Sequence, residues 1–331
     1  PDGRVLYMRW EYVDRSQVHY HHLWTTNPDG TEQSVFYGNL HPGVAMLDAK
    51  PIPGTEKVVS IFSPGHGQHE HQGQVTIVDP GDGPDNQSFA KAAGPDTNFR
   101  DPYPLSENVF LVARGAELLL MDAEGNTHAA YQLPGEDVAQ GLWCHEPRLI
   151  APHARERVIA PMANLTKATG RLLLTDVYRG RNMAGVNRGD IKKLLVLESL
   201  PKPINYTGGM DPLTYGGTFT LERVVGTVPV EPDGSAYFEL PALRAFFFVA
   251  LDENDDSVKR MQSFLTVQPG ETTSCVGCHE NRTDAVTPRT APAALRRAPS
   301  QVTPIDGIPE VFAFPRDVQP ILDRHCVRCH K

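Results

Sequence analysis

The chain has 331 residues, of which 40% are apolar and 29 are proline, and its formal net charge is −9. This composition excludes a chain that is disordered throughout, and the many prolines predict turns and few long helices. The acidic balance argues against a nucleic-acid partner, because phosphate binding needs clustered Lys and Arg. The densest apolar run, residues 242–251, contains Arg244 and is shorter than the ~20 residues of a membrane span, so no transmembrane helix is predicted.

The first half of the sequence predicts short β-strands separated by turns rich in Pro, Asp and Gly. The predicted strands cover residues 5–12, 23–26, 34–37, 57–62, 74–78, 109–113 and 117–121. Similar acidic turns begin at Asn27, Asp79 and Asp122, at spacings close to one four-stranded propeller blade. Residues 1–175 are therefore predicted to form a partial β-propeller, with a β-sandwich as the alternative.

A second β-rich domain is predicted over residues 176–283. Its strands are expected at residues 172–178, 191–197, 218–230, 236–240 and 246–251. Residues 284–312 are rich in Pro and Ala and are interpreted as a linker. Residues 313–331 contain a short amphipathic helix, interpreted as the start of a truncated cytochrome c domain. The helix face comprises Val318, Ile321, Leu322 and His325. The fold class is thus mainly β.

Four of the five cysteines fall into two Cys-x-x-Cys pairs, and a histidine follows each pair directly. The two motifs are Cys275, Cys278 and His279, and Cys326, Cys329 and His330. This is the attachment signature of c-type haem. The two thiols add to the vinyl groups of the porphyrin, and the histidine becomes an axial ligand of the iron. We therefore expect two covalent haem sites, with His279 and His330 as iron ligands.

Other uses of the cysteine pairs are weaker. Zinc ribbons separate their pairs by about 15–20 residues, whereas 47 residues lie between Cys278 and Cys326. A disulfide framework predicts no histidines. Cys144 is left over and is interpreted as a small buried side chain. Because thioether formation takes place outside the cytoplasm, the haem motifs predict a periplasmic or otherwise extracytoplasmic protein. We expect the chain to be a fragment of a longer protein, which would account for the missing signal peptide.

Two histidine clusters are further candidate ligands. His19, His21 and His22 are candidate distal ligands of the second haem; the alternative is a polar strand near solvent. The second cluster, at residues 66–71, includes His69 and His71, which could bind zinc together with Glu70.

The sequence resembles the hydrazine synthase alpha-subunit family of haem-bearing β-propeller proteins. The matching segments are residues 9–15, 23–30, 62–67, 226–234 and 268–280, within a resemblance that covers about residues 1–283. The resemblance implies a secreted or periplasmic haem protein, and for the namesake members it implies the joining of nitrogen compounds into hydrazine. In the namesake enzyme a tyrosine four positions after the motif histidine ligates the catalytic haem, whereas Thr283 stands at that position here.

These observations favour an extracytoplasmic multihaem c-type cytochrome that transfers electrons to a redox partner protein. One alternative is a haem-dependent oxidoreductase that acts on small nitrogen compounds. Another is a propeller that binds a partner and carries accessory haems. We expect the first haem to keep an open coordination position, because no Met, Tyr or further His follows His279 before the end of the linker. The second haem is expected to be six-coordinate.

Overall fold

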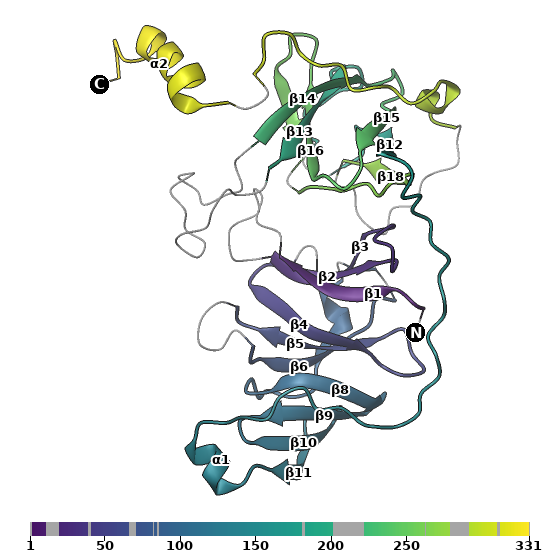
Figure 1. Ribbon diagram of the computed structural model, residues 1–331, viewed down its shortest axis with the longest axis vertical. Helices are drawn as coiled ribbons and strands as arrows, with labels where there is room; N and C mark the ends of the chain where they lie inside the picture. The colour runs from purple at the N-terminus through teal and green to yellow at the C-terminus, as the bar shows by residue number, and fades with distance from the viewer. Residues whose placement is uncertain are drawn as a thin grey trace. The chain divides into compact units, whose positions relative to one another are not determined.

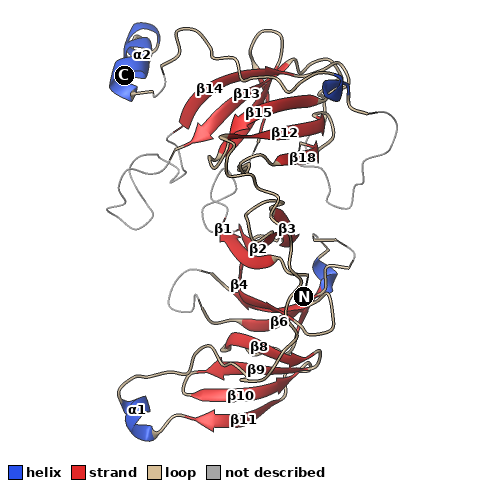
Figure 2. Ribbon diagram, turned by 45° about the vertical axis from the view of Figure 1, so that its right-hand side comes forward, coloured by secondary structure: helices blue, strands red, loops and turns tan. Residues whose placement is uncertain are grey.

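The structure is a computed structural model, and strands dominate it (Figure 1, Figure 2). It describes residues 2–10, 20–38, 41–65, 71–81, 83–84, 86–180, 183–200, 222–261, 263–278, 291–309 and 312–330. The chain divides into two compact units, Pro1–Met162 and Ala163–Lys331. The sequence places this boundary after residue 175. The structure places β12 (Thr169–Asp176) in the second unit, because β12 pairs with β15 (Ala236–Pro241) and β18 (Thr272–Gly277).

The first unit consists of antiparallel meanders. Its strands are β1 (Val5–Trp10), β2 (Tyr20–Thr26), β3 (Ser34–Tyr37), β4 (Val44–Pro51), β5 (Val58–Ser63), β6 (Gln74–Val78), β7 (Ala90–Ala92), β8 (Arg100–Ser106), β9 (Val109–Arg114), β10 (Glu117–Asp122) and β11 (Thr127–Gln132). Strands β4–β7 form one four-stranded meander and β8–β11 form the next. The β1–β3 group joins the first meander through a short parallel pairing of β2 with β4. One 3-10 turn, η1 (Gln87–Phe89), and one short helix, α1 (Gly135–Ala139), lie between or after these strands.

The main core of this unit lies between the two meanders. Ile61 and Val75 from the first meander pack in one apolar cluster with Phe110, Val112 and Met121 from the second. Successive four-stranded meanders that pack face to face are typical of propeller blades. In the described part of the chain the sheets do not close into a ring. The predicted strands at residues 23–26, 34–37, 74–78, 109–113 and 117–121 are confirmed.

Strand β8 shows why part of this unit escaped prediction. Its sequence contains Pro102 and Pro104, and proline within an apolar run argues against a strand. β8 lies at the edge of its sheet, where proline is tolerated because one side of the strand makes no ladder hydrogen bonds. Tertiary position therefore permits a strand that local sequence disfavours.

The second unit contains two further sheets. One has the order β15-β12-β18, and the other has the order β14-β13-β16-β17. The strands of the second sheet are β13 (Lys193–Ser199), β14 (Glu222–Pro229), β16 (Phe246–Leu251) and β17 (Ser257–Arg260). Phe238 of β15 and Phe246 of β16 are fully buried in the core that the two sheets share. This core also contacts the side chain of Cys275.

The predicted linker takes part in the second unit. It contains η2 (Ala293–Arg296), and Ser300 and Thr303 form backbone bridges with Phe238 of β15 and Thr227 of β14. Pro-rich extended backbone can make such isolated bridges without forming a full strand. After the linker, η3 (Phe314–Val318), a turn of π-helix, leads into α2 (Gln319–His325), so the predicted helix is confirmed. None of the described helices is long and apolar enough to cross a membrane.

Candidate functional site

The first Cys-x-x-Cys motif is an extension of a β-strand. Cys275 lies in β18, which runs parallel to β12 and places Cys275 opposite Leu174. Beyond the strand, the N–H of Cys278 donates to the carbonyl oxygen of Arg179 over 2.6 Å. Both thiols are partly exposed, and none of the described cysteines forms a disulfide. His279 lies outside the described residues.

Two glycines allow this motif to approach the turn that follows β12. A Cβ atom built on Gly180 would overlap the carbonyl oxygen of Cys278. One built on Gly277 would overlap the carbonyl oxygen of Arg179, and both contacts fall inside the 3.0 Å that real Cβ atoms keep. The two backbones therefore cross in direct contact, which only glycine permits at these positions.

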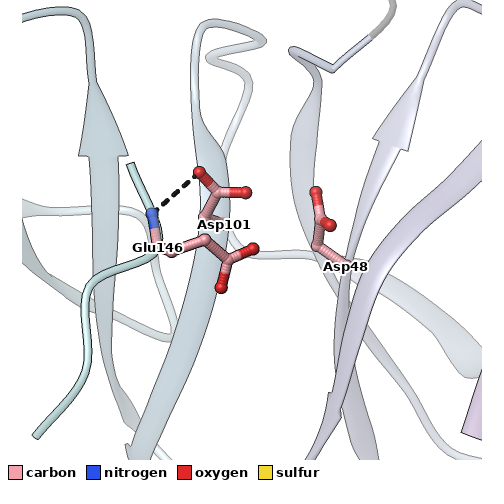
Figure 3. A group of neighbouring side chains, drawn as sticks. All are labelled: Asp48, Asp101 and Glu146. Atoms are coloured by element: carbon pink, nitrogen blue, oxygen red, sulfur yellow. Dashed lines mark hydrogen bonds between the residues drawn. The ribbon is translucent and has the colours of Figure 1, made fainter. Parts of the chain in front are cut away.

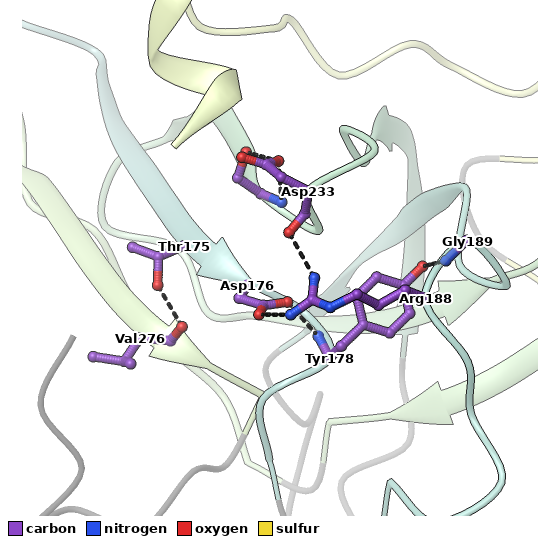
Figure 4. A network of polar contacts seen from close by, with 8 residues as sticks. Thr175, Asp176, Tyr178, Arg188, Gly189, Asp233 and Val276 are labelled. Atoms are coloured by element: carbon purple, nitrogen blue, oxygen red, sulfur yellow. Dashed lines mark hydrogen bonds and ion pairs between the residues drawn. The ribbon is translucent and has the colours of Figure 1, made fainter. Parts of the chain in front are cut away.

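A polar network holds the turn after β12 in place (Figure 4). The carboxylate of Asp176 accepts the N–H of Tyr178 over 3.1 Å and forms an ion pair with Arg188. Arg188 also donates to the backbone oxygen of Asp233 over 3.0 Å. The hydroxyl of Tyr178 accepts the N–H groups of Gly189 and Ile191. The turn is thereby tied to the segment after it and to the hairpin at residues 231–235.

The second motif has a different backbone. Cys326 follows α2, and its N–H donates to the carbonyl oxygen of Leu322 over 2.8 Å. The N–H groups of Cys329 and His330 both donate to the carbonyl oxygen of Cys326, over 3.0 and 2.9 Å. This compact turn brings the backbone of His330 close to that of Cys326. Cys329 and His330 are exposed.

Both motifs carry the donor set that haem c needs. Each offers two thiols and a histidine in the required order, and in the second motif the histidine backbone is turned onto the first cysteine. In the first motif the close crossing of Gly277 and Arg179 holds the segment between the two thiols. The residues present therefore fit covalent haem.

The histidine cluster on β2 is buried. His21 is 5% exposed and stacks on Trp10, with ring centroids 4.8 Å apart. His22 is fully buried and its ring lies 5.7 Å from that of Trp24. His19 lies outside the described residues. The two described histidines are packed side chains of the first unit rather than members of a solvent-facing strand, and their role as haem ligands stays a prediction.

The candidate zinc site falls mostly outside the described residues. His69 and Glu70 are not described, whereas His71 is described and exposed.

An acidic cluster in the first unit was missed by the sequence analysis (Figure 3). Carboxylate oxygens of Asp48, Asp101 and Glu146 lie within 4.8 Å of one another. All three residues have positive φ, at 55°, 51° and 45°, a conformation that is rare outside glycine. The carboxylate of Asp101 accepts the N–H of Glu146 over 3.0 Å. No local signal marks this cluster, because its members are about one blade apart in sequence.

Charge compensation accompanies this cluster. Burial, and then the charge of Asp101, raises the pKa of Asp48 above its ordinary value. Burial lowers the pKa of Lys50, whose Nζ lies 4.0 Å from Glu146. Arg148 forms a closer ion pair with Glu146, at 2.6 Å. Lys50 and Arg148 thus place two positive charges beside the carboxylate of Glu146.

The chain is thus a mainly β protein whose second unit carries a candidate haem-attachment motif on a strand. Residues 189–280 match the family model described as the hydrazine synthase alpha subunit middle domain. Over these residues the chain is therefore similar to the hydrazine synthase alpha subunit family, in agreement with the resemblance found in the sequence.

A solved structure shares the fold. The chain is similar to Kuenenia stuttgartiensis hydrazine synthase, with a TM-score of 0.74 and 19% sequence identity. The similarity covers 100% of this chain and 55% of that chain, so this chain spans about half of that protein's length. Among curated proteins, none matches the sequence.

Proposed function

We propose that the chain is part of an extracytoplasmic haem c protein built on a partial β-propeller. One haem would be held by Cys275, Cys278 and His279. The observation that carries this proposal is the match to the middle domain, because the matched residues 189–280 include the whole first motif. A periplasmic location follows from the same chemistry, since covalent haem is attached outside the cytoplasm.

The second haem would be held by Cys326, Cys329 and His330 at the start of a cytochrome c domain. The turn that brings the backbone of His330 onto Cys326 supports this assignment. When bound, haem c supplies a one-electron redox centre whose potential the protein tunes through ligands, hydrogen bonds and burial. The role of the chain is to hold the thiols and the axial histidines.

We infer that the two haems have different functions, catalysis at the first and electron transfer at the second. The matched model is named for a subunit of hydrazine synthase, which supports an oxidoreductase that acts on small nitrogen compounds at the first haem. The second motif, at the start of the predicted cytochrome c domain, supports electron transfer to a redox partner protein. Electron transfer at both haems is the alternative function, and the coordination of the first iron separates the two.

Haem content is the first test. The pyridine haemochrome assay on the chain, matured in a host that attaches haem c, should give two haems per chain. Replacing Cys275 and Cys278 with Ala should remove one, and replacing Cys326 and Cys329 should remove the other. Zinc in place of iron, with no haem stain on a denaturing gel, would refute the proposal.

Carbon monoxide distinguishes catalysis from simple transfer. An open ferrous haem binds carbon monoxide, whereas a haem with two strong protein ligands resists it. We expect binding to be lost in the Cys275→Ala/Cys278→Ala variant and retained in the Cys326→Ala/Cys329→Ala variant. Two low-spin haems that both refuse carbon monoxide would favour electron transfer alone.

A further inference from the structure

The two motifs differ at one inner position, and that difference calls for an explanation. Valine follows the first cysteine in both, at Val276 and Val327, but the next residue is Gly277 in one and Arg328 in the other. The attachment signature leaves both inner positions open. The glycine in the first motif is therefore a requirement of this fold rather than of haem attachment.

The surroundings of Gly277 supply that requirement. Its backbone lies opposite Asp176 in the β12–β18 ladder, and a side chain there would enter the carbonyl of Arg179. From the other side, a side chain on Gly180 would enter the carbonyl of Cys278. In the second motif the turn is closed by the carbonyl oxygen of Cys326, and the side chain of Arg328 is exposed.

Two hydrogen bonds join the segments at this crossing. The hydroxyl of Thr175 donates to the carbonyl oxygen of Val276, between the two motif cysteines (Figure 4). The N–H of Cys278 donates to the carbonyl oxygen of Arg179 over 2.6 Å. Val276, between the two cysteines, and Cys278, at the end of the pair, are thus both hydrogen-bonded to residues 175–180.

Residues 175–180, here called the platform, are themselves rigidly held. The N–H of Arg179 donates to the carbonyl oxygen of Asp176 over 3.1 Å, which closes a tight turn. The N–H of Val177 donates to the carbonyl oxygen of Gly234, and the carboxylate of Asp176 pairs with Arg188. The carbonyl oxygen of Arg179, which accepts the N–H of Cys278, therefore belongs to a turn that is held by residues outside the motif.

We propose that the platform positions the first haem, with Thr175, Gly180 and Gly277 as positioning residues. The inference rests on the proposed function, because it requires haem on Cys275 and Cys278. A haem joined to both cysteines follows the backbone that carries them, so a shift of this backbone moves the ring relative to its ligands and its polar surroundings. Those are the features that set the spectrum and the potential of haem iron.

The experiment compares variants of the chain matured with both haems. Gly277→Ala and Gly180→Ala push the crossing backbones apart from opposite sides, and Thr175→Val removes a hydroxyl from a side chain of the same shape. Thr175→Ser restores the hydroxyl and should restore the unaltered behaviour. Mass spectrometry of the two motif peptides gives covalent haem at each site, and electron paramagnetic resonance gives the signal of each ferric haem.

Two further variants are controls. Arg328→Ala changes the corresponding position of the second motif, where the side chain is exposed. Val249→Ala removes apolar volume from strand β16, in a buried cluster of the same unit that contains no platform residue, and so lowers the stability of that unit. It separates loss of stability from loss of positioning.

We expect haem to stay attached to both motifs in every variant, because all motif cysteines and histidines are retained. In Gly277→Ala, Gly180→Ala and Thr175→Val the signal of the first haem should shift or split into several species, while that of the second stays unchanged. Thr175→Ser and both controls should match the unaltered chain.

Unchanged signals in both Gly277→Ala and Thr175→Val would overturn the inference, and so would an equal change in Val249→Ala. If a glycine variant fails to fold, the Thr175 pair decides alone. Absence of haem from Cys275 and Cys278 in the unaltered chain would instead refute the proposed function, and the inference with it.

Discussion

Phe238 offers the sharpest test of how the second unit is held together. It is fully buried in β15, opposite Leu172 of β12, and its ring meets that of Phe248 edge to face with centroids 5.6 Å apart. Phe238→Ala removes the ring and leaves a cavity in the core that also contacts Cys275. Truncating a buried phenylalanine costs about 3–5 kcal/mol, which includes the ring pair worth about 0.5–1.5 kcal/mol.

The loss translates into a measurable shift in melting temperature. For a unit of this size, each kcal/mol lowers Tm by about 2–4 °C, so we expect a fall of about 6–20 °C. Far-UV circular dichroism follows the strands of both units. All three tryptophans, Trp10, Trp24 and Trp143, lie in the first unit, so their fluorescence reports on that unit. Phe238→Ala should therefore lower the Tm of the second unit in the dichroism signal and leave the transition seen by tryptophan fluorescence unchanged.

A matched control and a clear refutation complete this test. Phe312 is 43% exposed, so Phe312→Ala should change stability by no more than about 0.5 kcal/mol. A change in Tm below about 2 °C for Phe238→Ala would show that β15 and β12 do not depend on this core.

Three further predictions follow from single side chains. Glu198→Ala removes the buried carboxylate that forms ion pairs with Arg223 and Arg244, and should lower the free energy of unfolding in urea by about 3 kcal/mol. Glu198→Gln should lower it by less, and equal losses for the two variants would contradict the ion-pair reasoning. Burial and an acidic neighbour raise the pKa of Asp48, so the free energy of unfolding should fall as pH rises from about 3.9 to the raised pKa. Asp48→Asn should remove this fall and increase stability at neutral pH. Unfolding measured at several pH values checks both expectations. Gly234 has φ 87° and an added Cβ would lie 2.5 Å from Asp176, whereas Gly185 has φ 84° and an added Cβ there would meet open space. Gly185→Ala should lower the free energy of unfolding by about 1–2 kcal/mol, and Gly234→Ala should lower it by more. Equal losses would show that the contact with Asp176 is unimportant.

Some features follow from the sequence alone because they depend on residues close together in the chain. The two Cys-x-x-Cys-His motifs are defined by spacings of three residues and one residue. The turn of the second motif is closed by hydrogen bonds to the carbonyl oxygen of Cys326, within the motif itself. The strands β6, β9 and β10 follow from short β-branched runs between turn residues. The helix α2 follows from its apolar spacing.

Other features depend on distant partners and could not be predicted. Cys275 belongs to a strand because β12, about a hundred residues earlier, offers it a parallel ladder. The acidic residues Asp48, Asp101 and Glu146 meet because successive meanders stack, and His21 is buried because Trp10 covers it. Local propensity is weak, about 1 kcal/mol per residue, so long-range pairing and burial decide these outcomes. The sequence alone thus determined the two Cys-x-x-Cys-His motifs and the prediction of covalent haem. The tertiary structure decided what holds the first motif, because close backbone contact arises only when distant segments meet.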